Sequence, residues 1–69
     1  MRAGRRIRET IALLVAFPYI GHKGALPGTR EFVVRRSPYI VAYRIDTGDE
    51  ETIVILGIYH GAQRRPGQR

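Results

Sequence analysis

YIVAYRID, residues 39–46, is the stretch that decides the fold class. Its side chains alternate in character, so Tyr39, Val41, Tyr43 and Ile45 share one face of an extended strand. The segments on either side are also rich in β-branched residues. Three strands are therefore predicted, at about residues 29–36, 39–46 and 52–60. The connections between them are short, which makes consecutive strands antiparallel neighbours in a meander.

A segment with helical periodicity precedes the strands. Apolar residues from Ile7 to Val15 recur on one helix face, with arginines on the remainder. Pro18 pushes the residue before it out of helical conformation, which predicts a helix at about 4–17. A helix this short needs a sheet to pack on. The predicted fold is therefore α+β, with one N-terminal amphipathic helix on a three-stranded antiparallel meander.

Length and composition restrict the class of protein. The chain has 69 residues and no cysteine, which allows one domain and excludes disulfides and thiolate metal sites. The apolar run 11–17 follows arginines, but it is short and Pro18 ends it, so neither a signal peptide nor a membrane span is predicted. We expect a cytoplasmic protein that does not contact a membrane.

The charge is strongly positive and unevenly distributed. The formal net charge is +6, with arginines gathered in residues 2–8 and in the loose tail 62–69, and acids in residues 46–51. A basic excess favours an anionic partner such as nucleic acid or an acidic protein segment. Solubility alone would also account for it, and the arginines of 2–8 could simply be the solvated face of the helix.

Residues able to do chemistry are few. Residues 21–24 lack the spacing of a phosphate-binding loop, and no metal-ligand set is present, so neither a metal nor a cofactor is expected. Tyr59 and His60 fall at the same end of the meander as Arg35 and Arg36. There His60 could act as a general acid–base on RNA, with arginine stabilising phosphate charge. Alternatively, Tyr59 and His60 merely end a strand.

Three ordered segments, LPGTREFVV (26–34), PYIVAYRI (38–45) and IVILGIYHGAQR (53–64), resemble the sheet of RelE/ParE-type toxins. These are the poisonous half of type II toxin–antitoxin (plasmid-stabilisation) pairs. The resemblance implies one toxin domain over 1–69 and a cognate antitoxin as partner. Its RelE branch cleaves messenger RNA in the ribosome, and its ParE branch inhibits DNA gyrase.

The chain departs from the RelE branch at functional positions. Where that branch carries lysines on the first sheet strand, this chain has Glu31 and Val33, and the arginine after the central-strand tyrosine is Ile40. His60 matches a histidine of some RNase members. The implied roles are catalysis for His60, and target or phosphate binding for Arg30, Arg44, Tyr59, Arg64 and Arg65.

The usual N-terminal strand and first helix of the family have no counterpart here, which predicts an undercovered sheet and favours self-association as a homodimer. Together these features indicate a ParE-like toxin that binds a target of the gyrase type. The alternatives are a RelE-like, ribosome-dependent mRNA endoribonuclease and an inactive truncated remnant.

Overall fold

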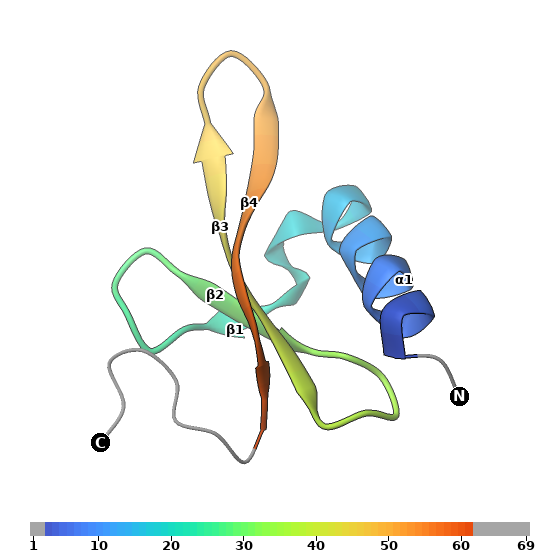
Figure 1. Cartoon of the computed structure of the whole chain (residues 1–69). Helices are drawn as coiled ribbons and strands as arrows, with labels where there is room; N and C mark the ends of the chain where they lie inside the picture. Colours follow the sequence, from blue (N-terminus) through green and yellow to red (C-terminus); the bar gives the residue numbers. More distant parts are fainter. Residues whose placement is uncertain (1–2, 62–69) are drawn as a thin grey trace.

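The sheet has four antiparallel strands in the order β1-β2-β3-β4 (Figure 1). The computed structural model describes residues 3–61. The strands are β1 (His22–Lys23), β2 (Arg30–Val33), β3 (Tyr39–Thr47) and β4 (Glu51–His60). The predicted α+β meander is confirmed, with β1 as an additional strand in a segment predicted to be a loop. A strand of two residues has no periodicity for a sequence to reveal.

Strands β3 and β4 form a long twisted hairpin whose far end projects beyond the rest of the sheet (Figure 1). Ala42 of β3 lies opposite Gly57 of β4. The next residue, Tyr43, lies opposite Ile55, so Leu56 is an extra residue on β4. This is a β-bulge, which strengthens the local twist and changes which side chains of the bulged strand share a face.

Strand β2 is shorter than predicted because a tight turn begins directly after it. The amide of Val34 donates to the carbonyl of Tyr39 (2.8 Å), and the amide of Ser37 donates to the carbonyl of Val34 (3.2 Å). Arg36 has a φ of 55°, in the left-handed region. A non-glycine residue adopts that conformation in turns rather than in strands, so residues 34–36 belong to the turn.

Helix α1 (Ala3–Ala16) agrees with the prediction to within one residue at each end. The amide of Phe17 donates to the carbonyl of Leu13 (2.8 Å), and the chain continues as a short 3₁₀ helix, η1 (Pro18–Ile20). Helix α1 lies on one side of the sheet (Figure 1). No helix in the described part of the chain combines the length and apolarity needed to cross a membrane.

The core lies between α1 and the sheet. Leu14 of the helix packs with Val34, Val41 and Tyr43, and all four side chains are fully buried. Partly buried apolar residues surround them: Ile7, Phe32, Tyr39, Ile45, Ile53 and Ile55. The face predicted from the alternation of residues 39–46 is therefore the face that the helix covers.

Candidate functional site

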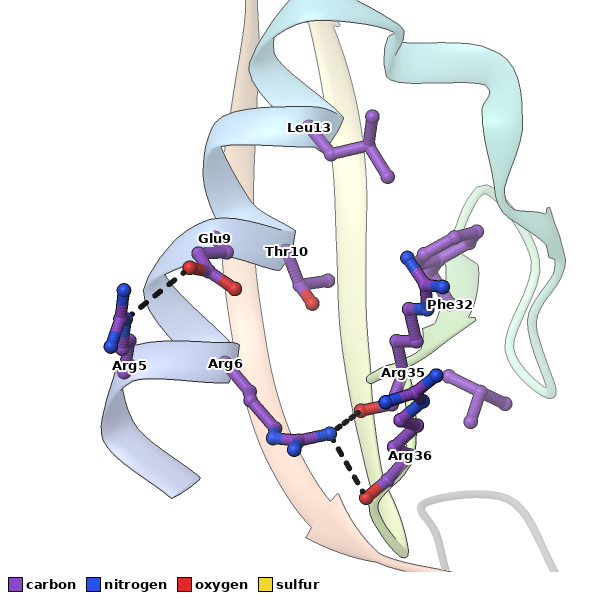
Figure 2. Close-up of a pocket in the computed structure, with 9 residues that line it drawn as sticks. Arg5, Arg6, Glu9, Thr10, Leu13, Phe32, Arg35 and Arg36 are labelled. Carbon is purple, nitrogen blue, oxygen red and sulfur yellow. Dashed lines mark hydrogen bonds and ion pairs between the residues drawn. The ribbon is translucent and has the colours of Figure 1, made fainter. Parts of the chain in front are cut away.

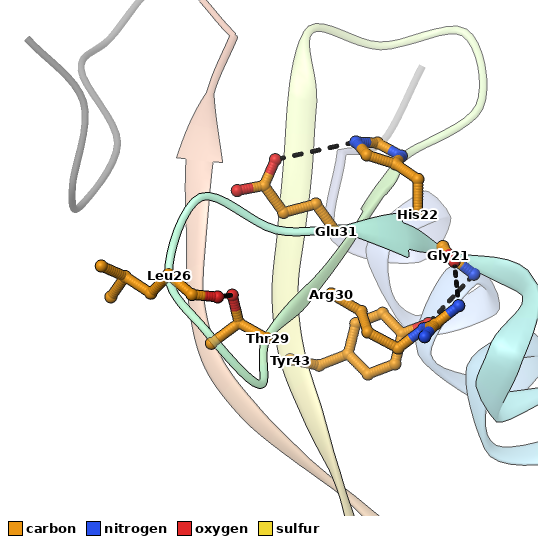
Figure 3. Close-up of polar contacts among 7 residues, drawn as sticks. All are labelled: Gly21, His22, Leu26, Thr29, Arg30, Glu31 and Tyr43. Atoms are coloured by element: carbon orange, nitrogen blue, oxygen red, sulfur yellow. Dashed lines mark hydrogen bonds and ion pairs between the residues drawn. The ribbon is translucent and has the colours of Figure 1, made fainter.

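Tyr43 fastens the loop between η1 and β1 to the sheet (Figure 3). Its hydroxyl donates to the carbonyl of Pro18 (2.6 Å) and accepts from the amide of Gly21 (3.0 Å). A Cβ at position 21 would lie 2.5 Å from that hydroxyl and 2.8 Å from the carbonyl oxygen of Glu31. Only glycine therefore allows the loop to approach the sheet this closely.

Arg30 holds the same loop from β2 (Figure 3). Its Nη2 donates to the carbonyls of Tyr19 (3.0 Å) and Gly21 (2.6 Å), and its guanidinium lies 5.4 Å from the centre of the Tyr19 ring. Its Nε is buried without a hydrogen-bond partner. Arg30, predicted to bind target or phosphate, is thus directed at the backbone of its own chain.

Tyr19 links the loop to the β3–β4 hairpin. Its hydroxyl donates to Oε2 of Glu51 (2.9 Å). This hydrogen bond, and next the charge of the Glu51 carboxylate, raise the pKa of the Tyr19 phenol above its ordinary value, against a smaller lowering by Arg30. The phenol therefore keeps its proton, and its hydrogen bond, into the alkaline range.

Tyr59 and His60 are adjacent in sequence but lie on opposite faces of the sheet. His60 is opposite Tyr39, and the two rings meet edge to face with their centres 5.7 Å apart. Tyr59 is opposite Ile40 and its ring lies against Gly57. Successive side chains of a strand point to opposite faces, so the two residues do not join in one site.

Arg44 lies apart from the other predicted site residues. It pairs with Val54 on the face away from α1, and its Nη1 is 3.9 Å from Oδ2 of Asp46. On that face the Nε2 of His22 also lies 3.9 Å from Oε1 of the buried Glu31, which joins β1 to β2 (Figure 3).

Arg64 and Arg65 fall outside the described residues. Within residues 3–61, no group of three or more histidine, aspartate or glutamate side chains could hold a metal ion.

A groove with a volume of about 960 Å³ opens between α1 and the end of β2 (Figure 2). We call it the arginine groove. Its lining consists of Arg5, Arg6, Glu9, Thr10, Leu13, Phe32, Val33, Arg35 and Arg36. Leu13 and Phe32 give it an apolar surface, and the arginines come from both sides of it.

The arginine groove is strongly positive. It has four arginines and one carboxylate, that of Glu9, which is 3.5 Å from Nε of Arg5. Nη1 of Arg6 donates to the carbonyls of Arg35 (3.2 Å) and Arg36 (3.4 Å), which ties the turn after β2 to the helix (Figure 2). An apolar surface with a cationic rim suits an acidic amphipathic segment, which buries its apolar side and pairs its acids with arginine.

The arginines of this groove are visible in the sequence, but their spacing along the chain does not show that they lie together. From the sequence, the arginines of 2–8 are expected to form a solvated face or a nucleic-acid contact, and Arg35 and Arg36 to lie near His60. The turn instead brings Arg35 and Arg36 to the N-terminal half of α1. The direction of the helix across the sheet decides this, and a single sequence does not give that direction.

A comparison with protein families identifies the family of the chain. The family model described as the ParE toxin of the type II toxin-antitoxin system, parDE, matches residues 2–65. The chain belongs to this family.

A relative in Sinorhizobium fredii (strain NBRC 101917 / NGR234) carries the name "Putative toxin Y4kP". It is 35% identical over 65 residues, which cover 94% of this chain and 64% of the relative. The chain thus spans somewhat less than two thirds of the length of this relative. No solved structure matches the chain.

Proposed function

We propose that this ParE family member is a toxin that acts in the cytoplasm by binding a macromolecular target of the DNA gyrase type, and that a cognate antitoxin neutralises it by occupying the arginine groove. The observation that supports this most is the groove itself. It offers the apolar surface of Leu13 and Phe32 beside four arginines with a single carboxylate among them. An acidic amphipathic segment of an antitoxin is complementary to both features.

The placement of the predicted catalytic residues favours binding over RNA cleavage. His60 packs against Tyr39, Arg30 is bonded to loop carbonyls, and Arg44 is near Asp46 on the other face. A general acid–base and a phosphate-stabilising arginine must lie within reach of one reacting group. These three side chains occupy three separate environments.

Binding of an antitoxin tests the first half of the proposal. At a free antitoxin concentration of a hundred times Kd, binding adds about 2.7 kcal/mol to the free energy of unfolding. For a domain of this size the melting temperature should rise by roughly 10–20 °C. The measurement is thermal unfolding of the toxin with increasing antitoxin, and the absence of any shift would refute neutralisation by this partner.

A charge reversal tests whether the groove is the binding site. The double variant Arg35→Glu/Arg36→Glu should weaken antitoxin binding at least about tenfold, which is about 1.4 kcal/mol, because attraction becomes repulsion. The matched control Arg8→Glu/Lys23→Glu makes the same change in charge at exposed positions outside the groove lining. Equal losses in both variants would mean that only net charge matters, and the groove would lose its role.

The target is tested separately with purified proteins. Inhibition of DNA supercoiling by gyrase, relieved by antitoxin, is the expected result. Cleavage of ribosome-bound messenger RNA that the His60→Ala variant no longer performs would instead establish the RelE-like activity. Growth that is unaffected by expression without antitoxin would indicate an inactive remnant.

A further inference from the structure

The wall of the arginine groove contains a buried hydroxyl group, that of Thr10. Arg6, Thr10 and Leu13 follow one another along α1 at spacings of four and three residues, so their side chains form one stripe on the groove side of the helix. Thr10 is only 6% exposed, although its side chain is polar. Figure 2 shows this side chain directed from α1 toward the strand side of the groove.

The Thr10 hydroxyl has no hydrogen-bond partner within residues 3–61. Buried hydroxyls are normally bonded, and a threonine inside a helix often donates to the carbonyl four residues earlier. A buried hydroxyl that lacks a partner lowers stability, whereas an aliphatic residue of the same shape would not. The hydroxyl is therefore available to a group that enters the groove from another molecule.

The charges of the groove indicate what that group is. Arg5 lies beside Glu9, and Nη1 of Arg6 donates to the carbonyls of Arg35 and Arg36. In the described part of the chain, the guanidinium groups of Arg35 and Arg36 have neither a hydrogen-bond nor an ion-pair partner. The available groups are thus two cationic donors and a hydroxyl that can also donate. A negatively charged acceptor satisfies all of them.

We propose that the Thr10 hydroxyl donates a hydrogen bond to an aspartate or glutamate side chain of the antitoxin, beside the guanidinium groups of Arg35 and Arg36. This inference rests on the proposed function and adds the residue that selects an acid inside the groove. A carboxylate that enters beside Leu13 loses part of its hydration, so it needs a donor there. Low local polarity also strengthens the hydrogen bond that replaces the water.

The free chain provides the first test, which needs no antitoxin. Thr10→Val keeps the β-branched shape and a similar helix propensity, and it removes only the hydroxyl. Its melting temperature should equal or exceed that of the wild type, because a buried polar group without a partner is lost. A clear fall would show that the hydroxyl is already bonded within the fold, and would overturn the proposal.

Antitoxin binding provides the second test. The probe is a purified antitoxin that restores growth when it is co-expressed with this chain. Thr10→Val should raise its Kd about ten- to a hundredfold, the value of a hydrogen bond to a charged group. Thr10→Ser keeps the hydroxyl and should stay within about fivefold of the wild type, since one methyl group is lost. If Thr10 contributed only apolar contact, the order would be reversed and Thr10→Val would bind better than Thr10→Ser.

A double-mutant cycle identifies the acid. Each aspartate of the antitoxin is changed to asparagine and each glutamate to glutamine, one at a time. The acid that meets Thr10 should weaken binding to the wild-type chain but cause little further loss with Thr10→Val, whereas acids elsewhere should add their losses independently.

The outcomes separate this inference from the proposed function. A wild-type chain that binds no antitoxin refutes the proposed function, and this inference with it. If the wild type binds but Thr10→Val binds equally well, or if no acid of the antitoxin is coupled to Thr10, only this inference is overturned.

Discussion

The two ends of strand β2 use arginine in different ways. At its start, Arg30 is bonded to the carbonyls of Tyr19 and Gly21 and lies over the Tyr19 ring. Just beyond its end, Arg35 and Arg36 are exposed on the rim of the arginine groove. One end is closed by loop backbone, and the other is open to a partner.

The difference shows that the neighbouring backbone, rather than the residue type, decides what an arginine does. Loop carbonyls without strand partners lie beside Arg30, and a guanidinium satisfies them with fixed geometry. The carbonyls of Arg35 and Arg36 accept instead from Arg6 of the helix. The side chains of Arg35 and Arg36 are thereby left on the rim of the groove.

The largest expected effect comes from the closed end. Tyr43→Phe keeps the buried ring but removes the partner of the Pro18 carbonyl and of the Gly21 amide. It should lower the free energy of unfolding by about 1–3 kcal/mol, measured by denaturant unfolding. The control Tyr59→Phe removes a hydroxyl without a hydrogen-bond partner among the described residues and should change stability by less than about 0.5 kcal/mol. Similar losses in both would contradict the role given to Tyr43.

A direct comparison of the arginines comes next. Arg30→Met should destabilise the fold by about 1–2 kcal/mol, toward the lower part of the range for charged hydrogen bonds because the site is partly exposed. Arg35→Met should stay within about 0.5 kcal/mol of the wild type, because that side chain lines an open groove. Equal losses, again from denaturant unfolding, would erase the distinction between the two ends of β2.

The smallest effect concerns the Tyr19–Glu51 contact beside the closed end. The raised pKa of the Tyr19 phenol means that this contact contributes its full stability below the unfolded pKa, about 10. The contribution is lost as the pH rises through the higher folded value. Wild type should therefore exceed Tyr19→Phe slightly in melting temperature at neutral pH, and the difference should vanish in strongly alkaline buffer. A difference that grows with pH would contradict this sign.

Much of the fold could be predicted because its signals are local. The alternation of residues 39–46 gave both a strand and its buried face, and Pro18 gave the end of the helix to within one residue. Strand β1 and the early end of β2 could not be predicted. The first is too short to have a pattern, and the second depends on the left-handed conformation of Arg36, which its residue type does not require.

The candidate site was predicted less well than the fold, because residues were grouped by strand end. That reasoning placed Tyr59 and His60 together, whereas adjacent positions of a strand face opposite ways. It also grouped Arg35 and Arg36 with His60, whereas the helix brings Arg5 and Arg6 to them. A bulge such as that at Leu56 is equally invisible in a sequence, because it depends on how two strands match in register.

The sequence by itself determined the helix, the long strands, the buried face and the basic charge, since each follows from periodicity or composition within a short segment. Only the tertiary structure decided which arginines fasten a loop and which line a groove, and which residues of β4 share a face. These depend on distances between segments far apart in the chain, and local sequence patterns do not encode such distances.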